Sequence, residues 1–323
     1  MLDKKEKSAQ DTVQKRLSTI KRLGRDMVLS HEVLAQCPVA IKEICRAADA
    51  LDIRTRVVGM FRPQFSHMKA IYGQWLFRAP SRLKEIRKTL LDYAISPEWF
   101  GQYEKFFIAC IITDYETASM LHKGHILKFK ENFALLKELL SPFSTEVVCG
   151  YLPRTGGRHE LVHQFCKLAR LEDTTFPEER AKKNENTSFH PLLIEAVSYS
   201  IERNFLTSLS NPHINNREFA QVSSIIEREI PVWGYNSDIE AAAQDYTADF
   251  FETSNCSFFR DYGISEKVLP LSHLNKQGEL TKDTFLTLVR SVQEKRKANP
   301  EEFMRYVRTC MAACSLSIIC SLQ

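Results

Sequence analysis

The sequence predicts an α/β protein with a small parallel sheet and a large helical periphery. A short apolar run at residues 56–61 ends at Arg62, and a helical pattern of apolar residues follows at once. A second such unit begins near residue 146, and most of residues 81–140 repeats apolar residues every three or four positions. Strands that alternate with helices pair in parallel, because each helix carries the chain back to the start of the sheet.

The first fifty residues predict a helix, a strand and a second helix. Val13, Leu17, Ile20 and Leu23 have helical spacing, and Gly24 suits the end of that helix. The sequence "DMVLSHE" predicts a short strand over 26–30, parallel to the later strands. An amphipathic helix is expected over 33–51.

The apolar run at 56–61 has the composition of a strand buried on both faces. Pro63 suits the first turn of the helix that follows, because its fixed φ is compatible with a helix start. The apolar residues of that helix share one face: Phe65, Met68, Tyr72 and Trp75. Arg62 lies at the joint, where ligands of parallel sheets bind, and is therefore a candidate phosphate ligand. The alternative is an arginine that pairs with a surface carboxylate.

The remaining elements are a third strand and more helices. "EVVCGYL" at 146–152 predicts the strand, and the loop "PRTGG" and a helix over 158–170 follow. Three helices are expected between 190 and 253. We predict an α/β domain over 1–263 and a helical C-terminal extension over 264–323.

Composition excludes several classes of protein. The formal charge of +4 is too small to predict a nucleic-acid-binding protein, although it allows a local basic pocket. Nine scattered cysteines without a Cys-x-x-Cys pair predict free thiols rather than disulfides. The first twenty residues lack the apolar core of a signal peptide, and the apolar C-terminal stretch is too short for a membrane helix. These observations favour a cytoplasmic protein without a metal site or a transmembrane segment.

Two strand ends supply further candidate site residues. Ser30, His31 and Glu32 follow the first expected strand. Glu32 is a candidate general base, and His31 competes for that role because its pKa is ordinarily near neutrality. The alternative is that Ser30 and Glu32 cap the helix that begins near residue 33. After the third strand, Arg158 and the preceding Gly-Gly could bind an anion, although the glycines also suit a plain turn.

Four stretches of the chain carry a family resemblance: "DMVLSHEVL", "VVGMFRPQFSHMKAIYGQW", "EVVCGYLPR" with the later "NENTSFHPLLIEAV", and "FFETSNCSFFRDYG". In order and spacing they resemble the bacterial sulfotransferase-like proteins, which share the P-loop fold of enzymes that use 3′-phosphoadenylyl sulfate. The resemblance covers roughly residues 10–263. It implies a small parallel sheet of P-loop or sulfotransferase type.

The resemblance also implies roles for single residues. Glu32 matches the position of a catalytic base, and Arg62 matches the arginine that holds the cofactor's 3′-phosphate. Ala70 departs from the family pattern, which has a serine there. A first strand with a 5′-phosphosulfate loop should precede residue 10, where this sequence predicts a helix, and no standard P-loop motif occurs elsewhere. Either the sequence begins downstream of a natural start, or the phosphosulfate site has been lost.

The absent first strand matters for the sheet. In the family it lies between the strands that match 56–61 and 146–151. Without it, the sheet either has open interior edges or closes up by one strand.

The function that the resemblance implies is transfer of a sulfuryl group from 3′-phosphoadenylyl sulfate to a hydroxyl of a saccharide or similar acceptor. Glu32 or His31 would act in catalysis, and Arg62, Ser30 and Arg158 would bind the cofactor. The rival hypothesis is a non-catalytic relative that acts as a binding or scaffold protein.

Overall fold

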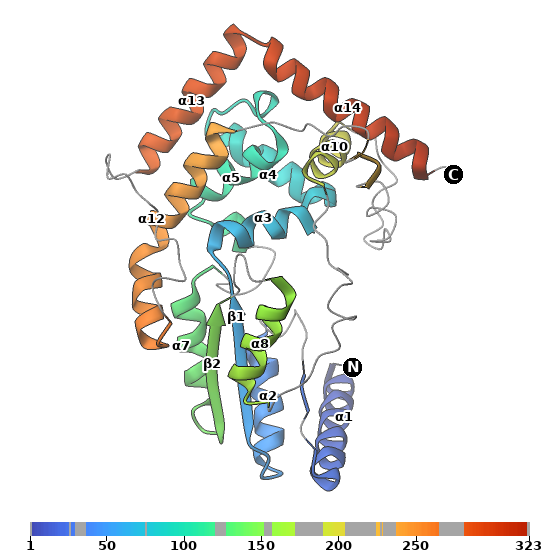
Figure 1. Cartoon of the computed structure of the whole chain (residues 1–323), viewed down its shortest axis with the longest axis vertical. Helices are drawn as coiled ribbons and strands as arrows, with labels where there is room; N and C mark the ends of the chain where they lie inside the picture. Colours follow the sequence, from blue (N-terminus) through green and yellow to red (C-terminus); the bar gives the residue numbers. More distant parts are fainter. Residues whose placement is uncertain are drawn as a thin grey trace. The chain divides into compact units, whose positions relative to one another are not determined.

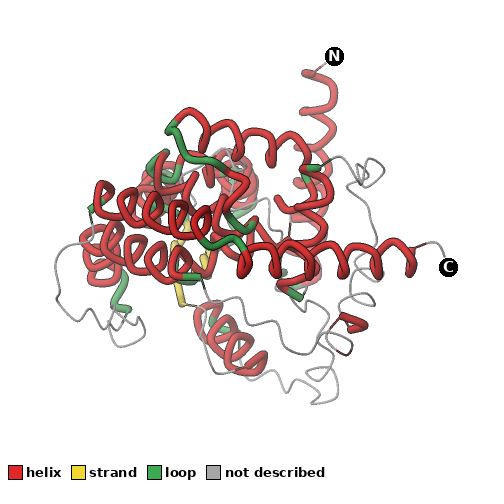
Figure 2. The backbone as a smooth tube through the Cα atoms, turned by 90° about the horizontal axis from the view of Figure 1, so that it is seen from above, coloured by secondary structure: helices red, strands yellow, loops and turns green. Residues whose placement is uncertain are grey.

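The computed structural model describes residues 2–25, 27–29, 37–74, 76–119, 127–151, 157–171, 190–203, 224–226, 228, 237–264 and 281–321. Helices make up most of this part of the chain, and two short strands make up the rest of its regular structure (Figure 2). The chain forms two compact units. Unit 1 comprises Met1–Arg62, Ser119–Lys182 and Phe251–Leu271, and unit 2 comprises Pro63–Ala118, Lys183–Phe250 and Ser272–Gln323.

Unit 1 contains the sheet. Its described elements, in chain order, are α1 (Leu2–Leu23), α2 (Pro38–Asp49), β1 (Thr55–Phe61), α7 (Phe129–Leu140), β2 (Thr145–Tyr151), α8 (Gly157–Ala169) and the second half of α12 (Asp238–Asp261) (Figure 1). β1 pairs with β2 in parallel, with Thr55 opposite Thr145 and Phe61 opposite Tyr151. The prediction that these two strands are parallel is confirmed.

Helices cover both faces of this sheet. A Cβ atom on Gly59 of β1 would collide with the Phe133 ring of α7, whereas one on Gly150 of β2 would collide with Leu168 of α8. Gly59 lies opposite Cys149 in the register, so Gly59 and Gly150 face opposite sides of the sheet. The order α7, sheet, α8 is therefore a three-layer α/β arrangement.

The prediction of a strand over 26–30 is wrong for the residues that the structure describes. Residues 27–29 form no strand, and all three of their side chains are exposed; positions 26 and 30 lie outside the described residues. The apolar composition of this stretch favours a strand locally, but a strand also needs a neighbour to accept its backbone hydrogen bonds. Here β1 and β2 pair directly with each other.

The burial of β1 also differs from the prediction. Residues 55–60 are half-buried instead of buried on both faces, and Phe61 is the buried residue of the strand. The reason is that the described sheet has two strands, so each strand has an edge without a partner strand. The apolar run at 56–61 therefore forms a strand in a sheet of two described strands, although its composition is typical of a strand with neighbours on both sides.

Unit 2 is helical. Its described elements are α3 (Gln64–Gln74), η2 (Leu76–Arg78), α4 (Pro80–Asp92), η3 (Pro97–Trp99), α5 (Gln102–Ile112), α6 (Glu116–Ser119), α10 (Pro191–Glu202), the first half of α12, α13 (Lys282–Ala298) and α14 (Glu301–Ser321). Every residue of α5 is buried. A helix of sequence "QYEKFFIACII" has apolar residues on all sides, which suits a central position in a bundle.

The C-terminal helices belong to unit 2, where α14 packs along α10. The predicted division of the chain at residue 263 stays a prediction. The cysteines whose side chains the structure describes are free thiols. Four of them are buried: Cys45, Cys110, Cys149 and Cys310. Within the described ranges, each helix is too short or too polar to cross a lipid bilayer.

Candidate functional site

Arg62 is the candidate site residue that the structure describes. It follows the last residue of β1, at the carboxyl end of the parallel pair. This is the edge of a parallel sheet at which ligands bind, because the backbone amides of the strand-to-helix loops converge there. The predicted position of Arg62 at a strand end is confirmed.

An aromatic cluster holds the strand end in place. Phe61 has its ring centroid 4.9 Å from that of Phe129, 5.2 Å from that of Phe258 and 5.6 Å from that of Phe259. Phe258 and Phe259 belong to the second half of α12, and Phe129 begins α7. Three rings from two helices therefore fix the residue that precedes Arg62.

Arg62 is a half-buried cation without a partner in the described part of the chain. Burial lowers the pKa of its guanidinium, and neither a carboxylate nor a hydrogen bond offsets that effect. Removing a cation from water is unfavourable unless an anion or several acceptors replace the lost hydration. An anionic ligand would supply both a charge and acceptors, whereas the alternative of a surface carboxylate finds no support among the described residues.

The other predicted site residues cannot be placed beside Arg62. Ser30, His31 and Glu32 lie outside the described residues, and so do Arg154, Thr155 and Gly156. Arg158 lies in the first turn of α8, which confirms that it opens a helix, but its side chain is not among those described. Their proposed roles therefore stay predictions.

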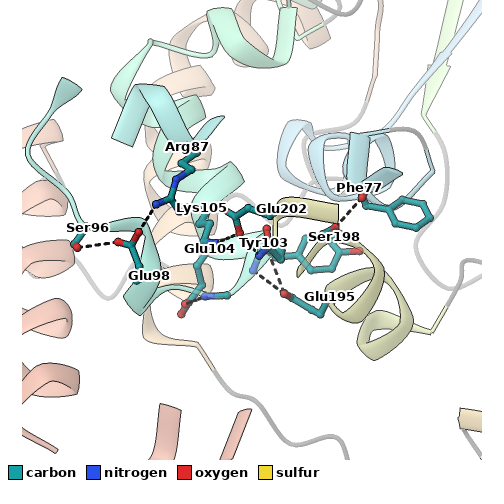
Figure 3. A network of polar contacts seen from close by, with 12 residues as sticks. Phe77, Arg87, Ser96, Glu98, Tyr103, Glu104, Lys105, Glu195, Ser198 and Glu202 are labelled. Carbon is teal, nitrogen blue, oxygen red and sulfur yellow. Dashed lines mark hydrogen bonds and ion pairs between the residues drawn. The ribbon is translucent and has the colours of Figure 1, made fainter. Parts of the chain in front are cut away.

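The sequence did not indicate a second cluster, a network of buried polar side chains in unit 2 (Figure 3). Glu195 of α10 is 4% exposed, and its carboxylate accepts hydrogen bonds from the backbone N–H groups of Gln102 at 2.6 Å and Tyr103 at 3.1 Å. The Tyr306 hydroxyl of α14 donates to the same carboxylate. Glu195 thus satisfies two amides in the first turn of α5, a position that favours a negative charge.

Two turns further along α10, Glu202 forms the second part of the network. Its Oε2 atom accepts from Lys105 Nζ at 2.5 Å and from Gln102 Nε2 at 2.8 Å. Arg87 of α4 donates to Oε1 at 3.3 Å and also pairs with Glu98. Burial alone would raise the pKa of Glu202, but the Lys105 charge and these hydrogen bonds hold it below its usual value.

Glu104 completes the network on the other side of α5. It binds both Nη atoms of Arg296 of α13, at 2.8 and 2.9 Å, and its Oε2 accepts from the backbone N–H of Gly101 at 2.8 Å. This fork-to-fork geometry is the strongest form of an arginine–carboxylate pair. The network therefore joins helices from distant parts of the chain, and each of its carboxylates is bound by protein donors.

We interpret this arrangement as one that holds the helices of unit 2 together. Glu195 and Glu202 each accept hydrogen bonds from three protein donors, so most of their acceptor capacity is used within the protein. The sequence contained one signal that could have revealed it. Glu195 and Glu202 stand seven residues apart in the apolar helix "PLLIEAVSYSIE", which places both on one face. Carboxylates in such a helix are buried only where a donor meets them.

Glu195 should make the stability of unit 2 depend on pH in a defined window. Burial raises its pKa from 4.5 to about 7, against the opposing effect of its three donors. The folded state therefore binds a proton that the unfolded state releases above pH 4.5, so the contribution of Glu195 to stability is fully present below 4.5 and falls as pH rises to 7. We expect a loss on the order of 3 kcal/mol across this window.

The measurement is urea unfolding of the full chain at half-unit pH steps. Glu195→Gln, which is neutral at every pH, should flatten the slope. Glu302→Gln, at an exposed position in the first turn of α14, is the matched control and should retain it. Glu202 and Glu98 have lowered pKa values, so their contributions are lost at lower pH, below 4.5. An unchanged slope in Glu195→Gln would contradict the prediction.

Comparison of this chain with protein-family models, curated proteins and solved structures gives no match.

Proposed function

We propose that this chain is a sulfotransferase-like protein that binds the 3′-phosphate of 3′-phosphoadenylyl sulfate through Arg62. The observation that carries the proposal is the half-buried guanidinium at the carboxyl end of β1, which has no partner among the described residues. A phosphate accepts two parallel N–H bonds from a guanidinium and supplies the missing charge. The choice of 3′-phosphoadenylyl sulfate as the nucleotide depends on the resemblance of the four sequence stretches, in their order and spacing, to sulfotransferase-like proteins.

The proposed reaction transfers a sulfuryl group to a hydroxyl of a saccharide or similar acceptor. The acceptor oxygen attacks sulfur, and the bond between sulfur and the bridging phosphate oxygen breaks. Glu32, or alternatively His31, takes the hydroxyl proton. The products are a sulfate ester and adenosine 3′,5′-bisphosphate. Ser30 and Arg158 are the further proposed contacts to the cofactor.

One observation favours a second candidate, a non-catalytic relative that retains only binding. β1 pairs directly with β2, whereas the family resemblance places a strand with the phosphosulfate loop between them. Direct pairing is what the resemblance leads us to expect of a sheet that has closed up by one strand. In the described sheet, no strand between β1 and β2 carries the backbone amides that would stabilise the moving sulfuryl group.

Binding at Arg62 is tested with adenosine 3′,5′-bisphosphate. We expect this nucleotide to raise the melting temperature of the full chain, with a dissociation constant on the order of millimolar. Arg62→Ala should abolish the shift, because a charge-assisted contact of about 1.5–3 kcal/mol is lost.

The matched control is Arg54→Ala, because Arg54 is an exposed arginine that precedes the opposite end of β1. This variant should bind like the parent protein. Equal loss in both variants, or no shift at saturating nucleotide, would overturn binding at Arg62. Transfer of labelled sulfate from 3′-phosphoadenylyl sulfate to a saccharide separates the enzyme from the binding protein.

A further inference from the structure

The C-terminal half of α1 is strongly basic. Between residues 11 and 25 the chain has one acidic residue, Asp11, and five basic ones: Lys15, Arg16, Lys21, Arg22 and Arg25. This short stretch carries as much net positive charge as the entire chain, whose formal charge is +4. The stretch is therefore a local basic cluster.

Most of these cations face solvent. Leu17 is buried and Val13 and Ile20 are half-buried, which is the side by which α1 packs on α2. Lys21 donates to the backbone oxygen of Leu51 and lies 4.0 Å from Asp52. The other four are exposed, and their side chains have no hydrogen bond or ion pair within the described ranges: Lys15, Arg16, Arg22 and Arg25.

Exposed apolar side chains lie directly beside this charge. Leu23 is 55% exposed at the end of α1, and Met27, Val28 and Leu29 are 37%, 53% and 49% exposed. Four large apolar side chains within seven residues form an unusual surface for a soluble protein, because such side chains normally pack inward. We call Lys15, Arg16, Arg22 and Arg25, together with these four apolar residues, the α1 surface.

We propose that the α1 surface docks the protein on an anionic lipid bilayer. Lys and Arg side chains at such a bilayer are attracted by the negative headgroups, and adjacent apolar side chains enter the boundary with the acyl chains. The combination distinguishes a bilayer from a nucleic acid, whose phosphates would engage the cations and leave the four apolar side chains in water. The occupant is thus a lipid surface that carries net negative charge.

The test is sedimentation of the full chain with lipid vesicles. We expect binding to vesicles of phosphatidylcholine mixed with phosphatidylserine, weak or no binding to phosphatidylcholine alone, and weaker binding as salt is raised. Arg16→Glu with Arg22→Glu should lower the partition coefficient at least about 25-fold, at about fivefold for each lost basic residue. Val28→Ser with Leu29→Ser should lower it at least about tenfold while leaving the charge unchanged.

The matched control reverses two exposed lysines of α4, Lys84→Glu with Lys88→Glu, which makes the same change in net charge. This variant should bind vesicles like the parent protein, and circular dichroism confirms that each variant is folded. Equal loss in the control, or no binding to vesicles containing phosphatidylserine, would overturn the proposal. A third result would also overturn it: duplex DNA abolishes vesicle binding, and Val28→Ser with Leu29→Ser leaves that binding unchanged. This pattern would identify a nucleic-acid surface.

Discussion

Glu202→Ala should destabilise unit 2 by about 3–5 kcal/mol. The Lys105 and Glu202 side chains are 5% and 7% exposed, and their atoms Nζ and Oε2 lie 2.5 Å apart. Removing the carboxylate leaves the buried Lys105 ammonium without the counter-charge that it contacts, which is the costly way to break a buried ion pair. It also removes the acceptor of the Gln102 side chain and one acceptor of Arg87.

The measurement is urea unfolding, with amide hydrogen exchange to locate the loss in α5 and α10. Glu294→Ala is the matched control, because Glu294 pairs with Lys297 on the surface of α13 and its side chain is 67% exposed. A surface pair of this kind contributes little to stability, because water screens both charges. Glu202→Leu with Lys105→Met should recover much of the loss, since it removes both charges together. A Glu202→Ala loss no larger than that of the control would contradict the prediction.

Phe258→Ala should destabilise unit 1 by about 3–5 kcal/mol. Phe258 is 1% exposed, and its ring contacts Phe61, Phe133 and Tyr262, with centroids 5.2, 5.1 and 4.8 Å away. Truncation removes buried apolar area and leaves a cavity that three rigid rings cannot fill. The substitution should loosen the packing at the end of β1, next to Arg62.

Phe250→Ala is the matched control on the same helix, because Phe250 is 42% exposed. It should cost about 1 kcal/mol, through lost contacts with neighbouring rings. Thermal unfolding of both variants, with hydrogen exchange in β1 and β2, makes the comparison. Similar losses in the two variants would show that the cluster around Phe61 does not hold the strand end.

Local sequence pattern was sufficient for several of the described helices and for the two strands. Apolar spacing predicted α1 and a helix at the position of α8, and the run at 56–61 predicted β1 to within one residue. The expected parallel pairing of β1 with β2 also holds. The helices and strands follow from residues within one or two turns of each other, where periodicity and turn chemistry act directly, whereas the parallel pairing was expected from the alternation of strands with helices. Arg62 at the strand end was predictable for the same reason.

The tertiary structure decided the features that depend on distant partners. Residues 27–29 have strand-like composition but no strand, because composition does not supply a neighbouring backbone to pair with. Lys105 and Glu202 are 97 residues apart, and Glu195 is 111 residues from Tyr306. Whether such groups are buried, and which donor meets which carboxylate, depends on how the helices pack. The sequence alone therefore determined several of the described helices, the two strands and the position of Arg62. Packing decided whether residues 27–29 form a strand, which charged groups lie inside the protein and which stay at its surface.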